Sequence, residues 1–477
     1  MTTFADAATA TVLHRGYTRT ENGMKTLKST LSANVDLFGS IVRGKNLVPA
    51  FEAAFKENPD TAMRVLQYAR DVRGGQGERE IFRSILKRLE RTRPDVLVES
   101  NILRNVAEIG RFDDLLIFDK LEVREAAFRI IAEALAAGNG LAAKWMPRKG
   151  PNAVALRQWL ELSPKQYRKL LVKLTNVVET QMCAREFDSI NFSHVPSVAM
   201  SRYMTAFHKR APEAFAAYKA ALVKGDKSVA KVNAGAVYPY DIVKMIGMGH
   251  YYNRGTGDAV IANEMWKALP DYMNGKAVLP MVDVSGSMGS GVAGTTTALD
   301  VAVSLGLYCA EKTKNEAFKD LFLTFSANPA FVKVSGTLSD RISQMVSSDW
   351  GMNTNLHAAF EAILNVAVRN NVPEADMPEF LLILSDMQFD QCARFDDSAL
   401  QMIRRKYEAA GYKVPAIVFW NLNARGSDKP VRFNERGVAL VSGFSPAIMK
   451  SVLAADLDRF SPESVMLQTV MIDRYNW

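Results

Sequence analysis

The chain has 477 residues, an apolar fraction of 48%, a charged fraction of 23% and a formal net charge of +8. This length exceeds one ordinary hydrophobic core, so we expect two domains, and the composition excludes a disordered or fibrous chain. The three cysteines, Cys183, Cys309 and Cys392, form no CxxC pair, which argues against a disulfide framework and a zinc site. No apolar run of bilayer length and no signal-peptide core occurs, so we expect a cytoplasmic protein.

The charge is distributed unevenly along the chain. Residues 1–270 carry a balance of +12, whereas residues 271–477 carry a balance of −4. Residues 141–240 alone hold 16 Lys and Arg against 6 Asp and Glu. A basic module joined to a slightly acidic one favours a polyanion, such as nucleic acid, as the partner of the first. The alternative is an ordinary solvated helical surface with a surplus of Lys and Arg.

The sequence pattern of the first part of the chain predicts a series of helices. Residues 1–20 mix Thr, Ala and Gly and are expected to form a flexible arm. From 21 to about 270, apolar residues recur at helical spacing, for example on both sides of Gly74 and Gly75. Further helices are expected near 101–118, 122–137, 164–182 and 211–223, and no strand-like alternation occurs before about residue 278. We therefore expect an all-α domain of stacked, HEAT-like helix pairs.

The pattern of apolar residues changes at about 271–277, and in residues 278–477 short apolar runs alternate with helical patterns. The runs expected to be strands are VLPMVDVS, LFLTFS, FVKVS, FLLILSD, VPAIVFWN and VALVSG. Buried apolar strands separated by helices indicate a parallel sheet covered on both faces. The second domain is therefore predicted to be a doubly wound, Rossmann-like α/β domain.

Oxygen-bearing side chains follow three stretches of this predicted domain. The first strand runs directly into Asp283, Ser285 and Ser287, Thr354 lies in the loop GMNTN, and Asp386 directly follows FLLILS. Ligands of open α/β sheets bind at the carboxyl ends of the strands. Two carboxylates and three hydroxyls, without nitrogen or sulfur ligands, suit a hard cation, and Mg²⁺ better than zinc.

The order DxSxS, then Thr, then Asp resembles the metal-ion-dependent adhesion site (MIDAS) of von Willebrand factor A domains. The resemblance implies that residues 278–477 form such a domain and that the metal keeps an open position for an acidic group of a partner. The alternative is that the five residues brace loops, with or without a metal.

Basic residues interleaved with aromatic ones gather in three segments of the helical region. They are Arg70, Arg73 and Arg79 in RDVRGGQGERE; Lys144, Trp145, Arg148 and Lys149 in KWMPRKGPN; and Arg202, His208, Lys209 and Arg210 in SRYMTAFHKR. Phosphate neutralisation and base stacking are what RNA binding needs. The alternative is that Trp145 is a core anchor and that the glycine turn is structural, with Arg79 paired to acids.

The order of the two predicted domains resembles the Ro autoantigen family, whose helical module is called TROVE. The segments RDVRGGQGERE, AKWMPRKG, VPSVAM, DVSGSMG, WGMNTN and LSDMQFD are closest to a related uncharacterised family of bacterial, phage and plant proteins. The resemblance implies that residues 21–270 are TROVE-like, that the helical repeats close into a ring, and that structured RNA binds the basic outer surface while single-stranded ends enter the hole.

These observations predict a monomeric, non-enzymatic RNA-binding protein, with no catalytic residues. Its basic helical domain binds small non-coding or misfolded RNA as a ribonucleoprotein, and its A-type domain holds Mg²⁺ for docking a protein partner. The main alternative is a metal-dependent protein-interaction or assembly module without a role in RNA. A metal-dependent hydrolase is the third hypothesis, and neither a general base nor a second metal site is apparent for it in the sequence.

Overall fold

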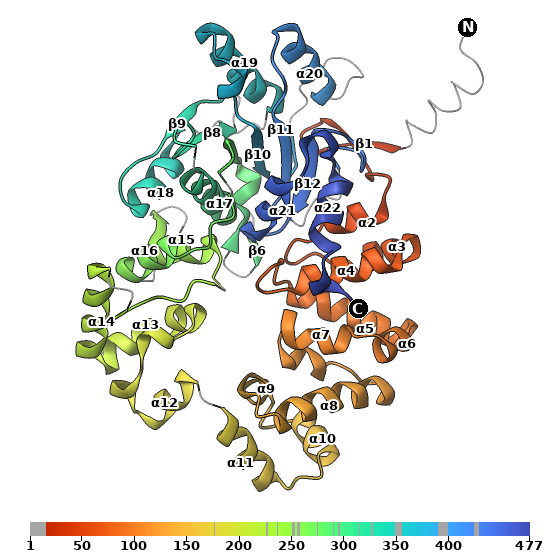
Figure 1. Ribbon diagram of the computed structural model, residues 1–477, viewed down its shortest axis with the longest axis vertical. Coiled ribbons are helices and arrows are strands. Elements are labelled where there is room, and N and C mark those ends of the chain that lie inside the picture. Colours follow the sequence, from red (N-terminus) through yellow and green to blue (C-terminus); the bar gives the residue numbers. More distant parts are fainter. Residues whose placement is uncertain are drawn as a thin grey trace. The chain divides into compact units, whose positions relative to one another are not determined.

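The computed structural model describes residues 16–477 except for 176, 226–227, 236, 250–252, 255–257, 274, 290, 294–295, 314, 326–327, 349–354, 390–398 and 424–428. Its contacts divide the chain into two compact units, which interleave along the sequence (Figure 1). The sheet unit comprises the chain up to Val65, Tyr238–Thr256 and Pro270–Met471. The helical unit comprises Leu66–Val237, Gly257–Leu269 and Ile472–Trp477. The domain limits at 21–270 and 278–477 stay predictions.

A six-stranded sheet forms the centre of the sheet unit. Its strands are β5 (Val278–Asp283), β8 (Leu321–Phe325), β9 (Phe331–Lys333), β10 (Phe380–Ser385), β11 (Ala416–Asn421) and β12 (Val438–Ser442). Their order across the sheet is β12-β11-β10-β5-β8-β9. Five strands are parallel, and β9 pairs antiparallel with β8. The Rossmann-like order is confirmed, whereas the expectation of a wholly parallel sheet is wrong at its β9 edge.

Helices cover both faces of this sheet. On one face, Met281, Ile383 and Phe419 share a hydrophobic cluster with residues of α19 (Leu356–Asn370) and α20 (Ala399–Ala409). The other face packs against α17 (Ala298–Lys312), and α22 (Pro462–Val470) packs on β12. A Cβ added to Gly306 of α17 would lie 2.5 Å from Cγ2 of Val282, so this close approach requires glycine. The doubly wound arrangement is therefore confirmed.

Smaller elements complete the sheet unit. Its other helices are α2 (Ala33–Phe38), α3 (Val48–Glu57), α15 (Pro239–Ile246), α18 (Leu338–Ser347) and α21 (Met449–Ala454). Its short strands are β1 (Tyr17–Arg19), β2 (Lys25–Leu27), β3 (Gly247–Gly249), β4 (Asn253–Arg254), β6 (Gly291–Ala293) and β7 (Thr296–Thr297). The expectation of no strand before residue 278 is therefore wrong, since β1 to β4 precede it. Residues 17–19 of the expected N-terminal arm pair with β2, and residues 1–15 lie outside the described part.

The helical unit contains α-helices joined by short loops. They are α5 (Arg79–Thr92), α6 (Pro94–Glu99), α7 (Ile102–Ile109), α8 (Leu121–Ala136), α9 (Gly140–Trp145), α10 (Pro151–Trp159), α11 (Pro164–Leu174), α12 (Val178–Ala184), α13 (Ser197–Arg210), α14 (Pro212–Lys224) and α16 (Ala259–Lys267), and the boundary with the sheet unit falls within α4 (Pro59–Arg70). The apolar spacing of α5 is confirmed, because Ile81, Phe82 and Ile85 are buried. The helix expected at 164–182 is two helices, α11 and α12.

Local signals explain where several of these helices begin. Pro occupies the first turn of α6, α10, α11 and α14, where its missing N–H has no helical partner to lose. Ser163 and Gln166 cap α11 reciprocally, and the Asn139 side chain accepts the N–H groups of Leu141 and Ala142 in α9. Within the part of the chain that is described, no helix combines the length and apolar character that a membrane crossing requires.

Candidate metal-binding and nucleic-acid-binding sites

The chain changes direction across the sheet between β5 and β10. From β5 it proceeds to β8 and β9 on one side, and then returns to β10, β11 and β12 on the other. β5 and β10 are neighbours in parallel register, with Val282 opposite Leu384. The carboxyl ends of two such strands form the crevice in which doubly wound sheets bind ligands. Asp283 ends β5 and Asp386 directly follows β10, so both carboxylates lie at this crevice.

Hydrogen bonds fix the acidic and hydroxyl side chains at this edge. Asp283 is fully buried, and its Oδ1 accepts the Ser285 N–H at 3.0 Å, while its Oδ2 accepts the Ser385 hydroxyl at 2.5 Å. The hydroxyl oxygens of Ser285 and Ser287 lie 3.0 Å apart. Asp386 is 3% exposed and accepts the Gln388 N–H. The structure thus places Asp283, Ser285 and Ser287 together, as the sequence predicts, with Asp386 on the neighbouring strand end; Thr354 lies outside the described residues.

The electrostatics of this edge suit a cation. Burial and the nearby charge of Asp386 together raise the pKa of Asp283 to about 7, against the hydrogen bonds from Ser385 and Ser285 that lower it. Two buried carboxylates repel each other unless a proton or a cation lies near them. Among the described residues, no group of three or more His, Cys, Asp or Glu gathers. With two carboxylates and hydroxyl oxygens, the donor set fits a hard cation such as Mg²⁺, which takes few protein carboxylates and keeps waters.

Ser385 and Gln388 belong to this site and were not singled out from the sequence. Ser385 is fully buried, and its hydroxyl both donates to Asp283 and accepts the Met387 N–H at 3.1 Å. The sequence signal that could have identified Ser385 is its position as the last residue of an apolar strand, directly before Asp386. A polar residue at the end of a buried strand needs a partner, and the neighbouring strand end supplies one.

The first basic segment forms a tight structural turn in the helical unit. Arg70 is 1% exposed, and its guanidinium pairs with Asp114 at 2.7–2.8 Å. This enclosed pair has no room for a phosphate, so Arg70 does not suit the predicted role in RNA binding. Arg73 is exposed, and Arg79 pairs with Glu80 at 3.1 Å. A Cβ on Gly75 would lie 1.9 Å from the Tyr68 carbonyl oxygen, which explains the glycine and supports the structural interpretation of this turn.

The second segment lies at the end of α9 and the loop after it. Arg148 and Lys149 are exposed, and Arg148 donates to the carbonyl oxygen of Met146 at 2.9 Å. The guanidinium carbon of Arg111 lies 3.5 Å from the centre of the half-buried Trp145 ring. One face of Trp145 is therefore already covered by a cation. Lys144 is 23% exposed and lies 3.6 Å from Glu179.

The third segment lies on α13 and adjoins the second. Arg202, His208, Lys209 and Arg210 are all exposed. His208 lies 3.3 Å from Asp258, whose carboxylate also pairs with Lys219 at 2.6 Å. Glu179 of α12 links the two segments, because the Tyr203 hydroxyl donates to it at 3.4 Å and Lys144 lies beside it.

A further basic surface, which the sequence analysis did not identify, lies on α11. Its four basic side chains are all exposed, while Tyr167 and Leu171 are buried on the opposite side: Lys165, Arg168, Lys169 and Lys173. None of the four pairs with an acidic side chain within the described part of the chain. Their spacing of three, four and eight residues along one helix was the signal that could have identified them.

The fold and these sites define a protein that joins an α-helical unit to a doubly wound α/β unit with a candidate cation site. Residues 20–109 and 126–279, more than half of the chain, match the family model described as Domain of unknown function (DUF2828), and the chain belongs to this family. Residues 277–470 match the model described as Domain of unknown function (DUF7788). Neither model is described as a TROVE or von Willebrand factor A domain.

Two further comparisons describe what the chain is similar to. An uncharacterized protein of Acanthamoeba polyphaga mimivirus is 28% identical over 513 residues, which cover 94% of this chain and 86% of the relative. The crystal structure of the Deinococcus radiodurans Ro (RSR) protein aligns with 89% of each chain at 15% identity, with a TM-score of 0.36.

Proposed function

We propose that this protein is a non-enzymatic, Ro-like RNA-binding protein. Its helical unit binds small non-coding or misfolded RNA through phosphate contacts. Its sheet unit, a von Willebrand factor A-like domain, holds Mg²⁺ and docks an acidic group of a protein partner. The observation that carries the RNA part is the basic surface of α11 and of the loop that ends α9.

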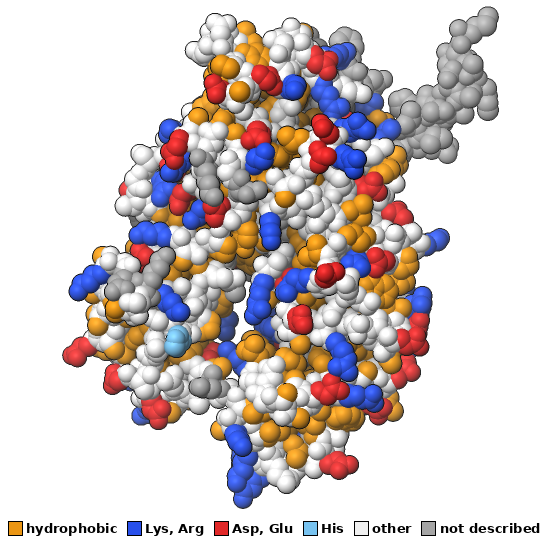
Figure 2. Space-filling model, in the orientation of Figure 1, with side chains coloured by type: hydrophobic (Ala, Val, Ile, Leu, Met, Phe, Trp, Pro, Cys, Tyr) orange, Lys and Arg blue, Asp and Glu red, His pale blue; other side chains and the backbone are white. Residues whose placement is uncertain are grey.

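This surface is strongly one-sided in charge. Between residues 144 and 174 the sequence holds eight Lys and Arg and a single acid, Glu161. Six of the eight, Arg148, Lys149, Lys165, Arg168, Lys169 and Lys173, are exposed. Figure 2 shows Lys and Arg side chains gathered at the lower edge of the view, where Figure 1 places α11. Exposed cations that outnumber the acids around them attract a phosphate backbone, because binding releases the counterions that RNA condenses.

The test removes the positive charges of four exposed side chains of α11, which should leave the fold of the protein unchanged. The variant combines Lys165→Gln, Arg168→Gln, Lys169→Gln and Lys173→Gln, and the readout is the fluorescence anisotropy of a labelled single-stranded RNA. Losing several phosphate contacts should weaken binding by about 10- to 100-fold. The control replaces Lys333 and Lys450, two exposed lysines of the sheet unit, by Gln. Equal affinity of both variants for RNA would favour the alternative, an assembly module without a role in RNA.

The metal part of the proposal is supported by the two buried carboxylates at the β5/β10 crevice. A divalent cation would offset the repulsion between the buried carboxylates of Asp283 and Asp386, and Ser285 and Ser287 offer neutral oxygens beside it. Such a cation, when bound, supplies a positive centre that a partner's carboxylate can approach. The test is titration of the full chain with Mg²⁺ in a calorimeter. We expect binding that Asp386→Asn abolishes, and a wild-type chain that binds no Mg²⁺ would refute this part.

A further inference from the structure

A small hairpin near the start of the described chain has a tightly defined turn. β1 and β2 are joined by residues 20–24, in which Thr20 is 4% exposed. The Thr20 N–H donates to the Met24 carbonyl oxygen at 2.9 Å, and the Met24 N–H donates to the Thr20 hydroxyl oxygen at 2.9 Å. Gly23 has a φ of +90°, which glycine adopts without strain. These bonds and the left-handed glycine define the conformation of the turn.

The turn binds the segment that directly follows Asp386. The Thr20 hydroxyl donates to the Phe389 carbonyl oxygen at 2.6 Å, and the Asn22 amide donates to the Gln388 carbonyl oxygen at 2.7 Å. The Glu21 N–H donates to the Gln388 side-chain oxygen at 2.7 Å. Three hydrogen bonds thus join two segments more than 360 positions apart in the sequence.

The segment that they hold contains a strained backbone residue. Met387 has a φ of +67°, a left-handed conformation that costs a non-glycine residue roughly 1–2 kcal/mol. The Gln388 N–H, next to this strained residue, donates to Oδ1 of Asp386 at 3.2 Å. The orientation of the Asp386 carboxylate therefore depends on a backbone that its own sequence does not favour.

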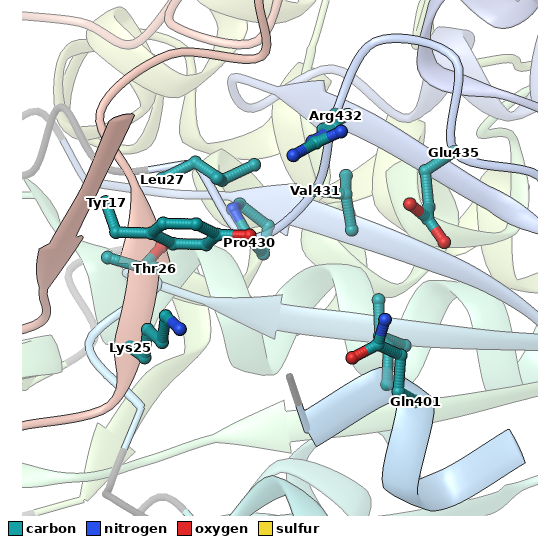
Figure 3. Close-up of a pocket in the computed structure, with 10 residues that line it drawn as sticks. Tyr17, Lys25, Thr26, Leu27, Gln401, Pro430, Val431, Arg432 and Glu435 are labelled. Carbon is teal, nitrogen blue, oxygen red and sulfur yellow. The ribbon is translucent and has the colours of Figure 1, made fainter. Parts of the chain in front are cut away.

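The second strand of the hairpin holds the segment after the neighbouring strand, β11. Leu27 and Lys429 exchange two backbone hydrogen bonds, at 2.9 and 3.0 Å, and the Thr26 hydroxyl donates to the Lys429 carbonyl oxygen at 2.9 Å. Figure 3 shows β2 beside Pro430 and Val431, which line a pocket of about 220 Å³ together with Tyr17 and Lys25. The hairpin thus forms hydrogen bonds with the segments that follow β10 and β11, two adjacent strands of the sheet.

We propose that Thr20 and Asn22 are positioning residues for the cation site, acting through Gln388 and Phe389 on Asp386. The inference rests on the proposed Mg²⁺ site. It adds that metal affinity depends on a hairpin whose side chains donate to Gln388 and Phe389 and not to the proposed metal ligands themselves. Groups that orient a metal ligand commonly change affinity by about 10- to 100-fold when they are removed.

The experiment uses the full chain with Thr20→Val and Asn22→Ala, separately and combined. We expect the affinity for Mg²⁺ to fall about tenfold or more in the double variant, and Thr20→Ser to retain it because the hydroxyl remains. Glu21→Gln is the matched control, since its exposed side chain takes no part in the contact, which uses the backbone N–H. Wild-type affinity in the double variant would overturn the inference.

A second readout separates this inference from the proposed function. Hydrogen exchange at the Met387 and Gln388 amides is measured in the metal-free protein, where it reports on the segment after β10 directly. We expect faster exchange in the Thr20→Val and Asn22→Ala variants and unchanged exchange in Glu21→Gln. Unchanged exchange in all variants would refute the positioning role, whether or not Mg²⁺ binds. A wild-type chain that binds no Mg²⁺ would refute the metal site, while the exchange rates still decide the role of the hairpin.

Discussion

The guanidinium of Arg474 donates two hydrogen bonds to the carboxylate of Asp71, Nε to Oδ2 at 2.5 Å and Nη2 to Oδ1 at 2.9 Å. The Tyr475 hydroxyl donates to the same carboxylate at 3.0 Å, and the Gln67 amide donates to the Tyr475 carbonyl oxygen at 2.6 Å. The Asp71 carboxylate is completely buried, so its charge depends on these donors. Residues 472–477 are therefore part of the helical unit, and the glycine turn that begins at Asp71 is the place where they dock.

Arg474→Ala should destabilise the helical unit. The buried Asp71 carboxylate would keep the Tyr475 hydroxyl and backbone donors but lose its cation, which we expect to lower the free energy of unfolding by about 2 kcal/mol. Urea denaturation followed by circular dichroism measures this loss. The exposed Arg459 is the matched control, and Arg459→Ala should change stability by no more than about 0.5 kcal/mol. Equal midpoints for the two variants would contradict the role assigned to the pair.

The same pair predicts a pH dependence. Burial alone would raise the pKa of Asp71, but Arg474 and the backbone donors outweigh it and hold the pKa below its ordinary value. A carboxyl whose pKa is lower in the folded state contributes its full stability above the unfolded pKa of about 4. That contribution is lost as the pH falls through the folded pKa. Below about pH 4, the unfolding free energy should therefore fall more steeply in the wild type than in Arg474→Ala.

Gly75→Ala should be among the most damaging single-methyl changes in the helical unit. The new Cβ would lie 1.9 Å from the Tyr68 carbonyl oxygen, a backbone atom that cannot move aside without opening α4. We expect a loss of about 3 kcal/mol or more, measured by thermal unfolding. At Gly235 of the same unit, a Cβ would meet nothing within 4 Å, so Gly235→Ala serves as the control and should be nearly neutral. A stable Gly75→Ala protein would show that the turn has room which the structure does not indicate.

Asp283→Asn separates the effects of the buried charge from those of the metal. Burial raises the pKa of Asp283 to about 7, so the metal-free protein should lose stability as the pH rises from about 4 to about 7, where the folded carboxyl must ionise. The asparagine variant should show a smaller loss over this range. At pH 8, Mg²⁺ should raise the melting temperature of the wild type and of the control Asp376→Asn, an exposed acid, but not that of Asp283→Asn. Equal stabilisation of all three by Mg²⁺ would place the cation elsewhere.

The salt dependence of RNA binding tests the loop after α9 independently of α11. If Arg148 and Lys149 each neutralise one phosphate, Arg148→Gln with Lys149→Gln should reduce the slope of log affinity against log salt by about 1 to 2. The slope is measured by titrating RNA at several salt concentrations. Arg148 also donates to backbone carbonyl oxygens, so the Lys149→Gln variant alone is the cleaner comparison. A slope that does not change in either variant would remove this loop from the predicted interface.

Much of the α/β fold was predictable from local pattern. β5, β10, β11 and β12 are short apolar runs in which every residue is buried, and a run of this kind between helices has few other arrangements. Asp283 and Asp386 could be assigned to one site because both directly follow such strands. The direction of β9 could not be predicted, because a three-residue strand at a sheet edge pairs equally well either way as far as its sequence shows.

The sequence by itself determined the succession of helices, the sheet and the acidic residues at the ends of β5 and β10, since these follow from apolar spacing and residue order. Only the tertiary structure decided which basic residues are exposed. Arg70 is buried because Asp114, 44 residues away, lies opposite its guanidinium, whereas the lysines of α11 are exposed and form no ion pair among the described residues. The structure alone also paired Thr20 with Phe389 and Asp71 with Arg474. Contacts between residues hundreds of positions apart depend on packing geometry, of which a single sequence carries no local signal.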